Sequence, residues 1–94
     1  MELEENLVIV YEEDNNRSAA YIDNVLVGIC EYEIELPYWI ITHTVVSPDH
    51  GGKGIAKKLV LKIIEEARNR KLKIKPICSY AKKVLDNPEY IDLL

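Results

Sequence analysis

Residues 38–56, YWIITHTVVSPDHGGKGIA, join a long apolar run to a glycine-rich turn and then to the start of an amphipathic segment. The run 38–46 is rich in β-branched and aromatic residues, which favours a strand. It is apolar on both alternating faces, so we expect a central strand that is covered on both sides. After the turn, apolar residues recur with helical spacing from Ile55 to Ala67. The stretch therefore predicts a strand, a loop and a long helix in direct succession.

The flanking sequence completes an α/β (α+β) fold. Turns at Asp14-Asn15-Asn16 and Asp23-Asn24 separate three earlier strands, which we place at residues 7–11, 18–22 and 25–35. A fifth strand at 72–77 should lie parallel to the fourth, because a helix connects the two. Ser79 should cap a short last helix that ends near Leu85, before Asn87-Pro88. We expect one domain over residues 1–94, with a mixed, mostly antiparallel sheet of about five strands, a long helix between strands four and five, and a short C-terminal helix.

Charge and composition exclude several classes of partner. The net charge of −4 argues against nucleic acid and against a membrane surface, since both require a basic face. Cys30 and Cys78 match no metal-ligand spacing, and we expect reduced thiols and no metal. Residues 1–5 are acidic and lack the apolar core of a secretion signal. No apolar stretch approaches the roughly 18 residues of a membrane span, so we expect a cytoplasmic protein.

The glycine loop, residues 51–56, has the composition of a phosphate-binding turn. It joins a strand to a helix, where free backbone N–H groups converge on an anion. Its spacing fits neither a Walker A loop nor a dinucleotide fingerprint, because lysines follow Ala56. Lys53, Lys57 and Lys58 oppose the helix dipole, and a bound phosphate group would reverse that unfavourable sign. The alternative is a structural turn beside solvated lysines.

At this loop the sequence resembles the GCN5-related N-acetyltransferases, whose signature Arg/Gln-x-x-Gly-x-Gly/Ala opens a helix after the fourth strand. The likeness is greater to a very small subgroup of acetyltransferase-like domains, through the run 42–46 (THTVV) and the element Cys78-Ser79-Tyr80. It covers nearly the whole chain. The resemblance implies acetyl-coenzyme A as ligand, with its pyrophosphate on the loop amides and its pantetheine arm along the fourth strand. The implied cofactor-binding residues are Val45, Val46, Gly51, Gly52, Lys53, Gly54, Ile55, Ala56, Lys57 and Lys58.

The chain departs from the larger family at three places. Gly51 stands where an Arg or Gln is usual, and Leu85 lies near the position of a tyrosine that reprotonates the leaving thiolate. The helices that shape the acceptor pocket between the first two strands are absent. These departures favour cofactor binding over any particular acetylation.

Three side chains are candidates for the chemistry. Cys78, which the resemblance places in an opening between the fourth and fifth strands, would accept the acetyl group covalently or donate a proton to the leaving thiolate; the alternative is an inert thiol. His43, expected on the face of Trp39 and Ile41, is a candidate general base or a core residue. Tyr80 is a candidate proton donor or a packing residue. His50 reads as a turn residue, Cys30 as core, and the row Glu31, Glu33 and Glu35 as a solvated face or an attraction for a cationic amine.

Two functions follow from these residues. The first is an N-acetyltransferase that moves an acetyl group from acetyl-coenzyme A to a primary amine of a peptide, polyamine or small metabolite. The second is a noncatalytic module that binds coenzyme A or its acyl esters; a structural domain without a cofactor is a third reading. The chain is expected to be a monomer or a weak homodimer, since the sheet edge is exposed.

Overall fold

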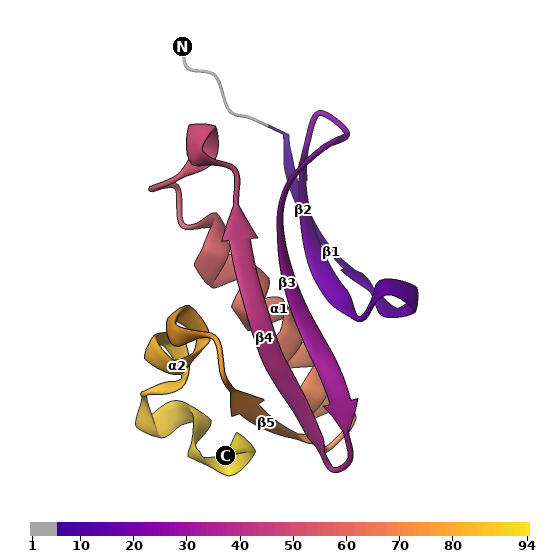
Figure 1. The fold of residues 1–94 in the computed structure, drawn as a ribbon, viewed down its shortest axis with the longest axis vertical. Coiled ribbons are helices and arrows are strands. Elements are labelled where there is room, and N and C mark those ends of the chain that lie inside the picture. Colours follow the sequence, from indigo (N-terminus) through magenta and orange to yellow (C-terminus); the bar gives the residue numbers. More distant parts are fainter. Residues whose placement is uncertain (1–5) are drawn as a thin grey trace.

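A computed structural model describes residues 6–94 of the chain. Five strands form one sheet in chain order; neighbouring strands are antiparallel except β4 and β5, which run parallel (Figure 1). The predicted five-stranded sheet, long helix and short C-terminal helix are confirmed, whereas the acidic residues 1–5 lie outside the described part. The elements are β1 Leu7–Glu12, η1 Glu13–Asn15, β2 Arg17–Ile22, β3 Val25–Glu35, β4 Tyr38–Val46, η2 Pro48–His50, α1 Ile55–Asn69, β5 Lys73–Pro76, α2 Ser79–Leu85 and η3 Pro88–Leu93.

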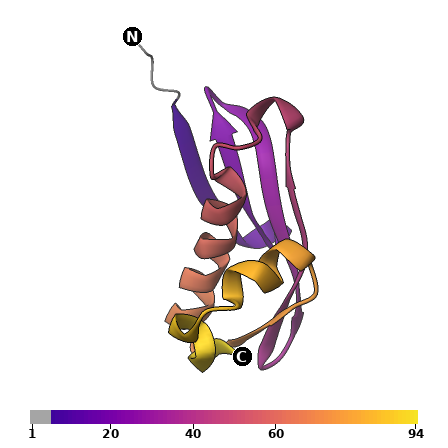
Figure 2. The ribbon, with the colours of Figure 1, turned by 90° about the vertical axis from the view of Figure 1, so that its left-hand side faces the viewer.

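Both α-helices lie on one side of the sheet (Figure 2). On this helix side, Trp39 and Ile41 of β4 are buried in the core, together with Leu59 and Ile63 of α1. No described helix covers the opposite face: Val45 there is 56% exposed, although Ile40, nearer the start of β4, is buried beneath neighbouring side chains of the sheet. The expectation that β4 is covered on both sides was therefore wrong. We call this uncovered surface the open face.

Close contacts fix the start of α1 against the sheet. The buried hydroxyl of Ser18 on β2 donates to the carbonyl oxygen of Leu59, 2.8 Å away. At Gly28 on β3, an added Cβ would lie 3.1 Å from the Val45 carbonyl oxygen and 3.2 Å from Cδ1 of Leu59. A side chain at this position would therefore push the helix away from β3 and β4.

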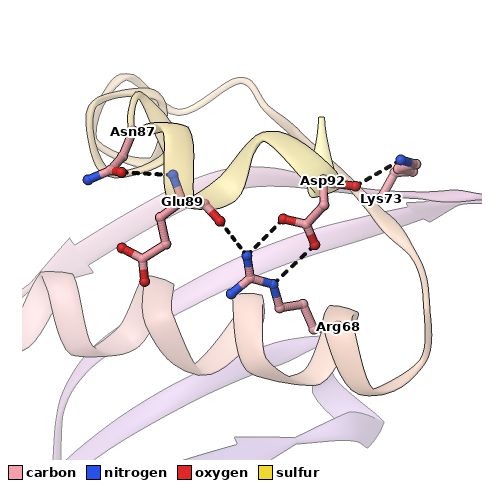
Figure 3. A network of polar contacts seen from close by, with 5 residues as sticks. All are labelled: Arg68, Lys73, Asn87, Glu89 and Asp92. Carbon is pink, nitrogen blue, oxygen red and sulfur yellow. Dashed lines mark hydrogen bonds and ion pairs between the residues drawn. The ribbon is translucent and has the colours of Figure 1, made fainter.

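The end of the chain adds a 3-10 helix that the sequence did not predict. Arg68 on α1 donates to the Glu89 carbonyl oxygen at 2.6 Å and pairs with Asp92 at 2.8 Å (Figure 3). Lys73 on β5 also donates to the Asp92 carbonyl oxygen. Tyr90 and Leu93 are buried in the core, so η3 packs against both α1 and β5. None of the helices described over residues 6–94 is long and apolar enough to cross a membrane.

Candidate functional site

Several backbone N–H groups are unpaired among the described residues where the glycine loop enters α1, although the Gly51 amide donates to the Pro48 carbonyl oxygen. Gly52 and Gly54 have φ angles of 79° and 77°, and Gly54 is the N-cap of α1 without a side-chain cap. Within residues 6–94, no acceptor takes a hydrogen bond from the amides of Gly52, Gly54, Ile55, Ala56 and Lys57. The first turn of α1 also contains no acidic residue. Free amides at a helix N-terminus form an environment that suits an anion.

The loop borders a cavity of about 270 Å³. A Cβ added at Gly52 or Gly54 would meet nothing within 4 Å, so the space beside both glycines is open. Lys57 and Lys58 are exposed next to it. The cavity is lined by Val46, His50, Gly51, Gly52, Gly54, Ile55, Ala56 and Tyr80. Most of the predicted cofactor-binding residues thus surround one space, and Tyr80 brings the first turn of α2 to the same space.

β4 and β5 separate halfway along β4, as the resemblance implies. Their register ends where Ile41 pairs with Pro76. The amides of Ile77 and Cys78 then both donate to the Ile41 carbonyl oxygen, at 3.0 and 3.1 Å, and the chain turns into α2. On the side of β4 that faces away from β3, residues 42 to 46 therefore have no strand beside them among the described residues (Figure 1). An exposed strand edge offers backbone groups to an extended ligand.

Cys78 is the N-cap residue of α2, which corrects the prediction that Ser79 caps this helix. Its Sγ lies 3.4 Å from Oγ1 of Thr44 on β4. Partial burial opposes ionisation of the thiol, but the Thr44 hydroxyl and the nearby backbone amides of Ala81 and Tyr80 stabilise the thiolate and outweigh that effect, so the pKa of Cys78 is lowered. A thiol with a lowered pKa is more often the reactive thiolate near neutral pH.

His43 lies on the open face, so its predicted position beside Trp39 and Ile41 was wrong. The β3–β4 register passes from Glu31↔His43 to Tyr32↔Ile41, which leaves Thr42 as an extra residue in β4. Such a bulge reverses the alternation of faces along the strand. The His43 side chain is 67% exposed, and its Nδ1 lies 3.7 Å from Oε1 of Glu31. His43 is therefore an accessible imidazole beside a carboxylate.

Two further residues complete this region: Thr44, to which the sequence assigned no role, and Glu31, which the sequence placed only in an acidic row. Thr44 contacts Cys78 on the helix side, and Glu31 contacts His43 on the open face. Thr44 belongs to the run that carries the family resemblance, but its contact depends on where the bulge falls. Leu85, at the position where the larger family has a tyrosine, is buried with 1% exposure. Cys30 is fully buried, as predicted.

Comparisons with known proteins identify the family of this fold and loop. The family model described as GCN5-related N-acetyltransferase matches residues 17–93. The chain belongs to the GCN5-related N-acetyltransferase family, which confirms the resemblance. The Cys78-Ser79-Tyr80 element of the subgroup stays a prediction. A search of curated protein sequences found no match to this chain.

Solved structures agree with this assignment. A GCN5-like protein from Staphylococcus aureus, solved by NMR, is 34% identical with a TM-score of 0.72, over 94% of this chain and 87% of that one. A ribosomal-protein-alanine N-acetyltransferase from Brucella melitensis is 25% identical with a TM-score of 0.59, over 74% and 57%. The PaiA N-acetyltransferase of Thermoplasma acidophilum, solved with coenzyme A, shares the fold at 21% identity and a TM-score of 0.57, over 60% and 35%. The chain thus spans little more than half, and about a third, of the latter two proteins.

Proposed function

We propose that this protein transfers the acetyl group of acetyl-coenzyme A to a primary amine. The observation that carries the proposal is the set of unpaired amides at Gly52, Gly54, Ile55 and Ala56, which face open space at the start of a helix. Such a group of donors suits a pyrophosphate, and the exposed Lys57 and Lys58 add positive charge to it. Lys53, whose Nζ lies 3.4 Å from Nδ1 of His50, adds a third cation to the loop.

The separation of β4 from β5 supports the position of the rest of the ligand. A pantetheine arm would follow the unpaired edge of β4 at Val45 and Val46, with the thioester reaching the opening above Ile41, where Cys78 lies. The PaiA N-acetyltransferase with coenzyme A has the same fold, which supports the choice of ligand. Bound there, acetyl-coenzyme A supplies the activated acyl group.

The chemistry proposed for the chain uses both faces of the sheet. His43, with Glu31 beside it, would remove a proton from the acceptor ammonium on the open face. The amine nitrogen then bonds to the acetyl carbon, the carbon–sulfur bond breaks, and the nitrogen gives its second proton to water as it becomes the amide nitrogen. Cys78, on the helix side, would give its proton to the leaving thiolate, or would itself take the acetyl group first and pass it to the amine. Tyr80, at the same cavity, is a second candidate for the proton donor.

A second candidate function is a noncatalytic module that binds coenzyme A or its acyl esters. The buried Leu85 favours it, because this side chain has no proton to give where the larger family has a tyrosine. Both functions require the same cofactor site. Transfer of the acetyl group separates them.

The test combines calorimetric binding of acetyl-coenzyme A with a transfer assay using radiolabelled acetyl-coenzyme A and a panel of peptides, polyamines and small amines. Wild type should bind the cofactor and label an amine, and Cys78→Ala should bind it but transfer about 10²–10⁴-fold more slowly, the usual contribution of a general acid. Ser79→Ala, at the exposed neighbouring position, is the matched control.

The outcomes of these assays distinguish between the two functions. Label that stays on wild-type protein without acceptor, and is absent from Cys78→Ala, indicates an acetyl-cysteine. Binding without transfer to any acceptor supports the module. Absence of binding contradicts both functions.

A further inference from the structure

The hydroxyl of Thr44 lies between the two cysteine sulfurs of the chain. Oγ1 of Thr44 is 3.4 Å from Sγ of Cys78 and 3.6 Å from Sγ of Cys30. Cys30 lies opposite Thr44 in the β3–β4 register, and Cys78 follows β5, so three separate segments bring the groups together. A hydroxyl has one donor and two acceptor sites, and it is therefore able to bond both sulfurs at once.

The two sulfurs differ in their ability to carry charge. Cys30 is fully buried, and burial raises the pKa of its thiol to about 11, so Cys30 keeps its proton and remains an S–H donor. Cys78 is only partly buried. Despite that burial, the Thr44 hydroxyl and the amides at the start of α2 lower the pKa of Cys78. A negative charge is thus more stable on Cys78 than on Cys30.

Other titratable groups of the neighbouring elements do not replace this contact. On β3 and β4, Glu31 and His43 pair with one another on the open face. Lys73 and Lys75 on β5 are exposed, and Nζ of Lys75 lies over the ring of Tyr38. From α2, Tyr80 lines the cavity of the glycine loop, and Lys82 and Lys83 are exposed.

We propose that Thr44 is a positioning residue, which holds the Cys78 sulfur at the opening between β4 and β5 and donates to it once it is a thiolate, while Cys30 donates to Thr44. With both thiols protonated, Cys78 S–H donates to Thr44, and Thr44 donates to Cys30. When Cys78 gives its proton to an acceptor or to water, the Thr44 hydroxyl turns toward Cys78 and the Cys30 S–H turns toward Thr44. Only the Cys78 proton is transferred; the other two hydrogens rotate with their bonds intact.

This inference rests on the proposed function for the use of Cys78, but its test does not require acetyl transfer. The pH dependence of Cys78 alkylation by iodoacetamide is followed by mass spectrometry of the modified peptide, in protein without acetyl-coenzyme A. The variants are Thr44→Val, which keeps the shape and loses the hydroxyl, and Thr44→Ser, which keeps the hydroxyl. Cys30→Ala removes the second donor, and Cys30→Ser retains one.

Thr44→Val should slow alkylation at pH 7.5 about tenfold and move the midpoint of the profile to higher pH, since a hydrogen bond to a charged group is lost. The plateau at high pH should be unchanged, because access to Cys78 is unchanged. Thr44→Ser should follow wild type. Cys30→Ala should shift the midpoint in the same direction by less, and Cys30→Ser should restore it.

Two results would overturn the proposal. One is a Thr44→Val profile that coincides with wild type in protein shown by circular dichroism to be folded. The other is a Thr44→Ser profile as shifted as that of Thr44→Val. Faster alkylation of Thr44→Val at every pH, together with new alkylation of the buried Cys30, would show that this variant has opened. In that case Thr44→Ser tests the proposal: a wild-type profile supports it, and a shifted profile contradicts it. If the titration behaves as expected and no acetyl-coenzyme A binds, the proposed function fails while the role of Thr44 stands.

Discussion

Nδ1 of His43 lies 3.7 Å from Oε1 of Glu31 on the open face, whereas Cys78 contacts Thr44 on the helix side of the same strand, β4. The two predicted catalytic groups are therefore separated by the sheet. In the proposed transfer, the group that deprotonates the amine and the group that protonates the leaving thiolate therefore act from different faces of the sheet. It also allows the two sides to be tested separately.

His43→Gln should lower kcat by about 10²–10⁴-fold, as loss of a general base does, without changing the affinity for acetyl-coenzyme A. Glu31→Gln should lower kcat less, because it removes only the partner of the imidazole. Glu33→Gln, on the next outward-facing position of β3, serves as the control. Steady-state kinetics and calorimetry together make the measurement. A His43→Gln variant with wild-type kcat would remove His43 from the mechanism.

Gly54→Ala and Gly51→Ala form a matched pair in the glycine loop. Gly54 has a φ of 77°, whereas Gly51 has a φ of −66° that any residue adopts, with its added Cβ an ordinary 3.6 Å from the Pro48 carbonyl oxygen. Gly54→Ala should weaken acetyl-coenzyme A binding about tenfold or more, because the methyl group and the altered backbone disturb the amides. Gly51→Ala should weaken binding much less, because its backbone conformation is open to any residue.

Thermal unfolding of the same two variants separates backbone strain from loss of the ligand site. A Gly54→Ala protein that melts earlier but binds acetyl-coenzyme A with unchanged affinity would count against a pyrophosphate at this position.

Gly28→Ala should lower the free energy of unfolding by about 1–3 kcal/mol, the usual cost of overpacking a closely packed site. The new methyl group would lie 3.1 Å from a backbone oxygen of β4 and 3.2 Å from the fully buried Leu59. One neighbour is backbone held in the β3–β4 pairing and the other is a core side chain, so relief of the contact requires α1 or β4 to shift. Urea denaturation of Gly28→Ala beside Gly51→Ala gives the comparison, and equal stability of the two variants would show that α1 adjusts its position without cost.

Stability should fall at alkaline pH because of Cys30. Its pKa is about 11 in the folded protein, above the ordinary value of 9.0, so its contribution is complete below pH 9 and is lost as the pH rises through 11. The expected loss from this group is about 2–3 kcal/mol. The raised pKa of buried Tyr32 acts in the same direction at still higher pH.

The Cys30 contribution is isolated by comparing Cys78→Ser with the double variant Cys30→Ala/Cys78→Ser, because the lowered pKa of Cys78 has the opposite effect. Urea denaturation between pH 8 and 11 should give a steeper loss of stability in the protein that keeps Cys30. Parallel curves for the two proteins would contradict the assignment.

Local patterns in the sequence were sufficient for the elements and for the glycine loop. Strand and helix periods, and the turn residues Asp23 and Asn24 with φ angles of 51° and 69°, depend on neighbours within a few positions. The start of α1 after Gly54 was predictable for the same reason. The 3-10 helix η3 was not, because Arg68 and Lys73, which hold it, are distant in sequence.

The sequence by itself determined the order of the elements, the place of the glycine loop before α1 and the family. Tertiary structure alone decided on which face of the sheet each β4 side chain lies, because the extra residue Thr42 turns His43 to the open face. It also decided where β5 stops pairing with β4, at the Ile41 carbonyl oxygen. It also placed Thr44 between Cys30 and Cys78. The physical reason is that alternation along one strand assigns faces only while the register is unbroken. A bulge is set by pairing with the neighbouring strand, and that pairing is absent from the strand's own sequence.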